Sequence, residues 1–111
     1  MTREERIKSL ARLYCYYMTE YHEAVRKLYK TIKEDEETVD VVCALSNVNA
    51  IDRIKIDPIL KLLQYEDVIC MERDNGKTVI HTRDYLTITI DEVIEDPFRI
   101  DFPTGFTYED D

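Results

Sequence analysis

A thiol and an imidazole are the side chains of this 111-residue sequence with the clearest capacity for chemistry. Asp74-Asn75-Gly76-Lys77 predicts a β-hairpin, because Asn-Gly tolerates the positive φ values of a type I′ turn. That hairpin sets Cys70 opposite His81, and a base beside a thiol can activate a nucleophile. The sequence indicates no third group to orient the base and no oxyanion site. We therefore interpret the pair as packing on a half-buried sheet face, and predict no catalytic residue and no enzyme activity.

An acidic run that follows the predicted strands is a second candidate for chemistry. It contains Asp91, Glu92, Glu95 and Asp96, and carboxylates are the ligands that hard divalent cations prefer. Calcium loops require alternating oxygen ligands, a glycine turn and a distal glutamate, and this run has no such order. The two glycines of the chain are also too isolated for a phosphate-binding loop. We expect a solvated acidic surface and predict neither a metal nor another cofactor.

Three cysteines, Cys15, Cys43 and Cys70, are spaced too widely for a zinc knuckle or a redox C-x-x-C pair. Their odd number favours reduced thiols, which are usual in the cytosol. No apolar run resembles a signal peptide or approaches the ~20 residues of a membrane span. We therefore expect a cytoplasmic protein that does not enter a membrane.

The elements that must position these residues begin with a long helix. Thr2-Arg3-Glu4-Glu5 has the form of a capping box. Apolar residues then recur at spacings of three and four up to Lys33, which predicts an amphipathic helix over residues 1–33. At ~1.5 Å per residue this helix is too long for a compact domain, so its apolar stripe must meet the folded-back chain or a second copy in a homodimer. The residues predicted for such a self-association seam are Leu10, Tyr14, Tyr17, Tyr21 and Leu28.

The remainder of the chain is predicted to form short helices, a small sheet and a tail. Residues 38–66 favour short helices, although the β-branched run 39–42 would also suit a strand. Asp57-Pro58 predicts the start of one helix, with aspartate as N-cap and proline at the first helical position. Residues 68–102 predict three or four antiparallel strands, and residues 103–111 an acidic tail. The expected fold class is α+β, in a single domain over residues 1–111.

Residues 38–83 resemble a winged-helix segment, with short helices followed by a hairpin as the wing. The stretch ILKLLQYEDVICMERDNGKTVIHT is similar to the third helix and wing of that family. In the family these parts usually contact DNA, and the resemblance assigns that role to Lys61, Gln64, Arg73 and Lys77. Neighbouring acids dilute these side chains, and phosphate binding needs a basic surface. Winged-helix domains that bind only proteins are therefore the better fit.

Charge is divided unevenly along the chain, whose formal net charge is −9. Residues 1–33 carry eight lysines and arginines against four acids, whereas residues 34–111 carry seven against twenty. An acidic excess of this size repels phosphate backbones and attracts basic surfaces. The carboxylates predicted to bind a partner are Glu34, Asp35, Glu36, Glu37, Asp91, Glu92, Glu95, Asp96, Glu109, Asp110 and Asp111.

We hypothesise a small acidic, non-enzymatic interaction protein: an inhibitor or regulator that docks its acidic face on a basic, nucleic-acid-handling protein and does not bind nucleic acid directly. Its extreme form is nucleic-acid mimicry, with carboxylates where phosphates would stand. In general character the chain is similar to small phage-encoded inhibitors of host or CRISPR-type machinery. The alternative is a winged-helix-like DNA-binding transcriptional regulator that dimerises through its N-terminal helix. An acidic surface that only maintains solubility would explain the same composition.

Overall fold

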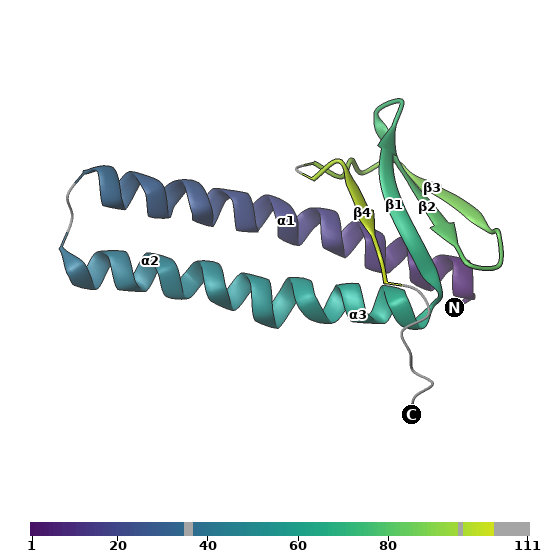
Figure 1. Cartoon of the computed structure of the whole chain (residues 1–111), viewed down its shortest axis with the longest axis horizontal. Helices are drawn as coiled ribbons and strands as arrows, with labels where there is room; N and C mark the ends of the chain where they lie inside the picture. The colour runs from purple at the N-terminus through teal and green to yellow at the C-terminus, as the bar shows by residue number, and fades with distance from the viewer. Residues whose placement is uncertain (35–36, 96, 104–111) are drawn as a thin grey trace.

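Two helical arms run antiparallel, and a four-stranded antiparallel sheet lies against one end of the pair (Figure 1). This computed structural model describes residues 1–34, 37–95 and 97–103. The molecule is elongated, with principal extents of 51 × 38 × 23 Å. The predicted α+β class is confirmed.

The first arm is helix α1, Arg3–Lys33, which begins two residues inside the predicted range 1–33 and ends where that range ends. The predicted capping box begins it: the Thr2 hydroxyl accepts a hydrogen bond from the Glu5 N–H at 3.1 Å, and the Glu5 carboxylate accepts from the Thr2 N–H at 2.8 Å. Ile7, Ala11 and Tyr14 of its apolar stripe are buried in the core. The first half of α1 is thus the support on which the rest of the domain packs.

The second arm is one helical run and not the set of short helices that the sequence predicts. It consists of α2, Thr38–Ala50, the π-helical η1, Ile51–Ile56, and α3, Asp57–Tyr65. The junction residues keep right-handed helical backbone angles, so Asp57 does not begin a separate helix. Pro58 has no N–H to donate four residues back, and the wider π-helical turn directly before it accommodates that gap.

The sheet has the strand order β3-β2-β1-β4, with β1 Val68–Asp74, β2 Lys77–Thr82, β3 Thr87–Ile90 and β4 Arg99–Asp101. The predicted turn is confirmed, because Asn75 and Gly76 have φ values of 52° and 73°. The predicted register is confirmed as well, with Cys70 opposite His81 and Met71 opposite Ile80. The fourth predicted strand pairs with β1, so the hairpin lies in the middle of the sheet.

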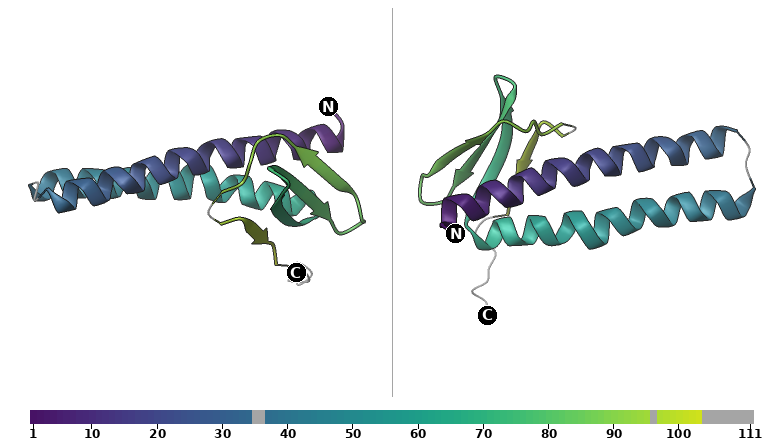
Figure 2. Two further views of the ribbon diagram at one scale, coloured as in Figure 1. Left: turned by 90° about the horizontal axis from the view of Figure 1, so that it is seen from above. Right: turned by 180° about the vertical axis from the view of Figure 1, so that it is seen from behind.

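The core lies between the sheet and the nearby ends of the two arms. Met71, Ile80 and Ile88 are buried on three adjacent strands, and Ile7 of α1 and Leu63 of α3 are fully buried with them. Figure 2 shows that the sheet covers only this end of the helical pair. The other end of the helical pair projects beyond the sheet.

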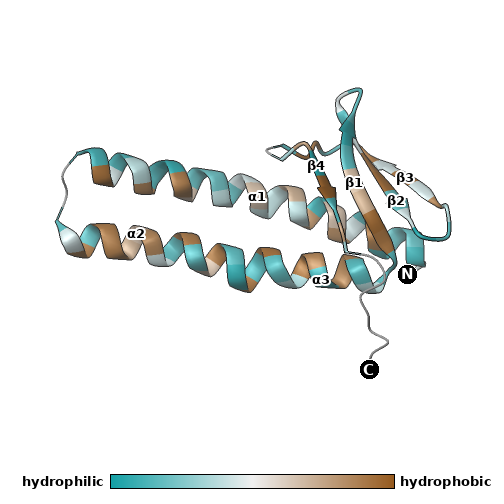
Figure 3. Cartoon of the chain, viewed as in Figure 1, coloured by the Kyte–Doolittle hydropathy of each residue, from teal (hydrophilic) through white to brown (hydrophobic). Residues whose placement is uncertain are grey.

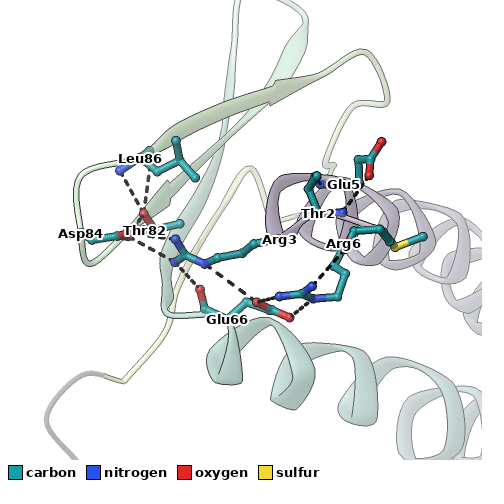
Figure 4. A network of polar contacts seen from close by, with 9 residues as sticks. Thr2, Arg3, Glu5, Arg6, Glu66, Thr82, Asp84 and Leu86 are labelled. Carbon is teal, nitrogen blue, oxygen red and sulfur yellow. Dashed lines mark hydrogen bonds and ion pairs between the residues drawn. The ribbon is translucent and has the colours of Figure 1, made fainter.

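Four charged side chains join the start of α1 to the end of α3 and to the loop after β2 (Figure 4). Arg3 forms an ion pair with Asp84 at 2.9 Å and donates to the Glu66 carbonyl at 2.8 Å. Arg6 forms an ion pair with Glu66 at 2.7 Å. We call Arg3, Arg6, Glu66 and Asp84 the N-terminal ion-pair network. It fixes the helix start to two loops that are distant in sequence.

This network predicts a loss of stability in acid. Hydrogen bonding from Arg3 lowers the pKa of Asp84 to about 2, and hydrogen bonding from Arg6 lowers the pKa of Glu66. A carboxylate with a lowered folded-state pKa stabilises the fold above its unfolded-state value, near 4, and that contribution disappears as the pH falls through the folded-state value. Asp84→Asn should therefore lower the melting temperature at pH 6 and flatten its fall between about pH 4 and pH 2. Circular dichroism melts across this range measure both effects.

The matched control is the same substitution in an Arg3→Gln background. If Arg3 is the partner that matters, Asp84→Asn should change the melting temperature much less there, because the interaction is already gone. An equal change in both backgrounds would show that the ion pair contributes nothing. The side chains of Arg3 and Asp84 are 32% and 61% exposed, so solvent weakens the ion pair and the effect in the single variant is expected to be small.

Candidate interaction surface

The projecting part of the helical pair has almost no core of its own. We define the distal hairpin as residues 20–34 of α1 and its C-cap together with residues 37–50 of α2 and its N-cap. Of these residues, only Ala24 and Val48 are buried. The two arms contact each other here, but no sheet lies over them (Figures 1 and 2). The apolar side chains of the distal hairpin are therefore covered by little besides the facing arm.

Five large apolar side chains of the distal hairpin face solvent. Their exposed fractions run from 47% to 64%, and we call them the apolar hairpin surface: Tyr29, Ile32, Val39, Val42 and Leu45. Figure 3 shows the brown, apolar segments of α2 continuing toward the hairpin turn. Residues three apart are neighbours on a helix, so Val39, Val42 and Leu45 form a row. An isolated surface helix normally carries polar residues at exposed positions, and exposed apolar patches mark interaction sites.

A groove between the two arms lies beside this surface. Its volume is about 360 Å³, and its lining consists of Ala24, Lys27, Thr31, Asp40, Cys43, Ala44 and Asn47. Most of these side chains are small, and so the arms leave space between them. A side chain from a partner could enter this groove.

The described members of the predicted acidic face divide between two places. Glu34 and Glu37 are exposed at the hairpin turn, whereas Asp91, Glu92 and Glu95 follow β3 near the middle of α1. Glu92 of the second group pairs with Arg12 of α1, and Arg12 is 22 positions from Glu34. This separation is roughly 30 Å along the helix at ~1.5 Å per residue, so the two groups of carboxylates lie far apart.

Cations of the same chain also neutralise part of the second group. Asp91 forms an ion pair with Lys77 at 3.1 Å, and Glu92 with Arg12 at 3.1 Å. The remaining predicted carboxylates lie outside the described residues: Asp35, Glu36, Asp96, Glu109, Asp110 and Asp111. The described carboxylates therefore do not form one continuous negative surface.

The residues predicted for a self-association seam pack within the chain. Tyr14 is buried, and the other four, Leu10, Tyr17, Tyr21 and Leu28, are partly buried against the core. The elements that α1 contacts are α2, η1 and α3 of the second arm and strand β3. Of the two alternatives that the length of the helix leaves open, the folded-back chain accounts for this stripe. A homodimer would have to use the apolar side chains that remain exposed.

The Cys70–His81 pair is adjacent as predicted, and it has a neighbour that sequence reasoning missed. His81 Nε2 lies 3.0 Å from Glu72 Oε2. The signal was present, because Glu72 is two residues from Cys70 on one strand and so shares its face. Burial raises the pKa of the Cys70 thiol, whereas an activated nucleophile requires a lowered pKa. Glu72 is thus a third group beside His81 that the sequence analysis did not identify, while the raised pKa of the Cys70 thiol opposes formation of the thiolate.

The cations that the winged-helix resemblance assigns to DNA are engaged within the chain. Lys61 forms an ion pair with Asp57 at 3.2 Å, and Lys77 with Asp91. The Arg73 guanidinium lies over the Phe98 ring, 4.6 Å from its centre. Gln64 lies on α3, the last segment of the second arm. Three of these four side chains therefore already have a partner within the chain.

Comparisons with protein-family models, curated proteins and solved structures find no match for this chain. Among the residues that the structure describes, no helix combines the length and the apolar character needed to cross a membrane. Function must therefore be argued from the residues and geometry of this chain.

Proposed function

We propose that this chain is a non-enzymatic protein-interaction protein that binds its partner through the distal hairpin. The observation that supports this is the apolar hairpin surface, where five apolar side chains are about half exposed or more. A helix that places such residues at spacings of three and four commonly lies in an apolar groove of another protein. In the row Val39, Val42 and Leu45 each residue lies three positions from the next.

The free energy of burying the apolar hairpin surface is too small to account for binding by itself. Full burial of a valine, leucine or isoleucine side chain contributes about 1.5–3 kcal/mol, so five half-exposed side chains contribute on the order of 5 kcal/mol. Association itself costs an estimated 4–15 kcal/mol. Apolar burial alone would therefore give at most weak binding. Complementary charge is the additional contribution that this chain offers.

The net charge of −9 favours a positively charged partner, because such a charge accelerates encounter with a basic surface. The partner class that fits is a basic protein with an apolar groove, such as one that handles nucleic acid, and the chain would act as its inhibitor or regulator. At the hairpin turn both signs of charge occur, with Lys30 and Lys33 close to Glu34 and Glu37. These local charges would orient the bound partner on the hairpin, while the net charge of the chain would attract the partner from a distance.

A double substitution, Val42→Lys with Leu45→Lys, tests this proposal. Both positions are exposed on a helix, where lysine is well tolerated, so the fold should persist. In a pull-down from the native host, retention of the partner should fall about tenfold or more, because two central apolar anchors become charged. Raising the salt concentration should also weaken retention by the unsubstituted chain.

The matched control is Tyr65→Lys, which changes an exposed apolar residue at the other end of the molecule. This variant should retain the partner fully. Equal retention by the double variant would overturn the proposal. If sedimentation shows that the free protein is a dimer, the apolar hairpin surface binds a second copy of the chain. Retention on random duplex DNA at low salt would favour the DNA-binding alternative instead.

A further inference from the structure

Three side chains that differ in chemistry meet on the face of the sheet opposite the helices. Cys70 and Glu72 lie two residues apart on β1 and share a face, and His81 on β2 is the cross-strand partner of Cys70. The thiol sulfur, a carboxylate oxygen and a ring nitrogen all lie within 4.8 Å of one another. Cys70 is only 5% exposed, whereas Glu72 and His81 are partly open to solvent. Solvent therefore reaches the carboxylate and the imidazole more readily than the thiol.

We propose that Cys70, Glu72 and His81 form a zinc site, with Sγ, one carboxylate oxygen and Nε2 as ligands and water as the fourth. Zinc takes thiolate, imidazole and carboxylate ligands in tetrahedral geometry, whereas hard cations such as calcium do not take thiolate. Bond lengths of about 2.0–2.3 Å place tetrahedral ligand atoms about 3.5 Å apart. His81 and Glu72 are closer than this at 3.0 Å, and the widest separation is no more than 4.8 Å. Side-chain movements of about 1 Å would bring all three to the metal.

The proton balance of binding is simple. Nε2 of His81 lies 3.0 Å from Oε2 of Glu72, and zinc would bind both atoms in place of this contact. His81 would bind through Nε2 as a neutral imidazole with its one proton on Nδ1, so the ring changes tautomer through solvent and releases no proton. The Cys70 thiol would release its proton to solvent, since thiolate is the ligand form. One thiolate and one carboxylate would together neutralise the dication.

A neighbouring arginine is placed to orient the carboxylate ligand. Arg99 of β4 donates from Nη1 to Oε1 of Glu72 at 2.8 Å, which leaves Oε2 directed to His81. Arg99 also binds Asp101, whose backbone pairs with Cys70. Outer contacts of this kind fix the geometry of metal ligands and tune affinity. An ion-pair network would account for Glu72, His81 and Arg99, but not for a thiol within reach of both ligand atoms.

Titration with Co²⁺, a spectroscopic substitute for zinc, tests the proposal in the full chain. Binding should produce thiolate-to-cobalt charge-transfer absorption that saturates at one equivalent and is displaced by Zn²⁺. Cys70→Ser should abolish this absorption, while Cys43→Ser, at the exposed cysteine, should leave it unchanged. Absorption that survives in Cys70→Ser, or that never develops, would overturn the proposal.

A second variant keeps the test valid if the buried cysteine cannot be replaced without unfolding. His81→Gln alters a partly exposed ligand, and its fold can be checked by circular dichroism. Arg99→Gln should weaken Zn²⁺ affinity by about 10–100-fold, because Arg99 only positions a ligand. His81→Gln removes a ligand itself and should weaken the affinity at least as much. Unchanged affinity in His81→Gln would also overturn the proposal. Neither result bears on the distal hairpin, which lies on other elements.

Discussion

Replacing Thr78 by valine should lower the free energy of unfolding by about 2–5 kcal/mol, although the two side chains have nearly the same shape. Thr78 is fully buried on β2, and its hydroxyl makes two hydrogen bonds. It donates to the Glu92 carbonyl at 2.6 Å and accepts from the Ile94 N–H at 2.8 Å. Valine leaves both backbone groups without this partner, and each buried unsatisfied group costs about 1–3 kcal/mol. Urea denaturation of the two proteins gives the difference.

Thr78→Ser is the control for this experiment. Serine keeps the hydroxyl and loses only a methyl group, so the expected cost is about 1 kcal/mol. Equal destabilisation by serine and valine would show that the hydroxyl does not hold the segment after β3. The predicted difference would mean that one side chain fixes the loop carrying Glu92 and Ile94 to the sheet.

Leu63→Ala is the second substitution with a large expected effect. Leu63 is 0% exposed on α3, in the core that α1, α3 and the sheet share. Truncation of a buried leucine removes its transfer free energy and leaves a cavity, at a cost of about 2–5 kcal/mol. Domains of this size are stable by only about 5–15 kcal/mol, so the melting temperature should fall clearly.

The adjacent residue provides a matched control for that substitution. Leu62 is on the same helix and is 47% exposed, so Leu62→Ala makes the same chemical change outside the core. It should cost less than about 1 kcal/mol, because little buried area is lost and alanine is a good helix former. Similar costs at both positions would contradict the described packing of α3.

Local signals in the sequence were enough for several elements. The capping box at Thr2 and the uninterrupted apolar stripe defined α1, since both depend on residues within a few turns. Asn75-Gly76 defined the hairpin and its register, because the turn geometry sets which residues lie opposite. β3 likewise lies within the range 68–102 that the sequence predicts to form antiparallel strands.

The second arm shows where such signals fail. Asp57-Pro58 is typical of a helix start, yet in the structure it lies inside a continuous arm. Contacts of η1 and α3 with α1 stabilise that arm, and these contacts are distant in sequence. The same limit applies to the candidate surface. The sequence shows that Val39, Val42 and Leu45 are apolar and regularly spaced. It does not show that they stay exposed, because that depends on the sheet covering only the other end of the two arms.

The antiparallel course of the two arms has a practical consequence for handling the protein. Residue 1 lies at the sheet end of α1, and the hairpin turn lies at the opposite end of a 31-residue helix, about 46 Å away at ~1.5 Å per residue. A biotin or affinity tag joined through a short linker before Thr2 would therefore anchor the molecule to a biosensor chip with its turn pointing into the bulk solution. Immobilisation in this orientation would leave the candidate binding surface unobstructed during screening.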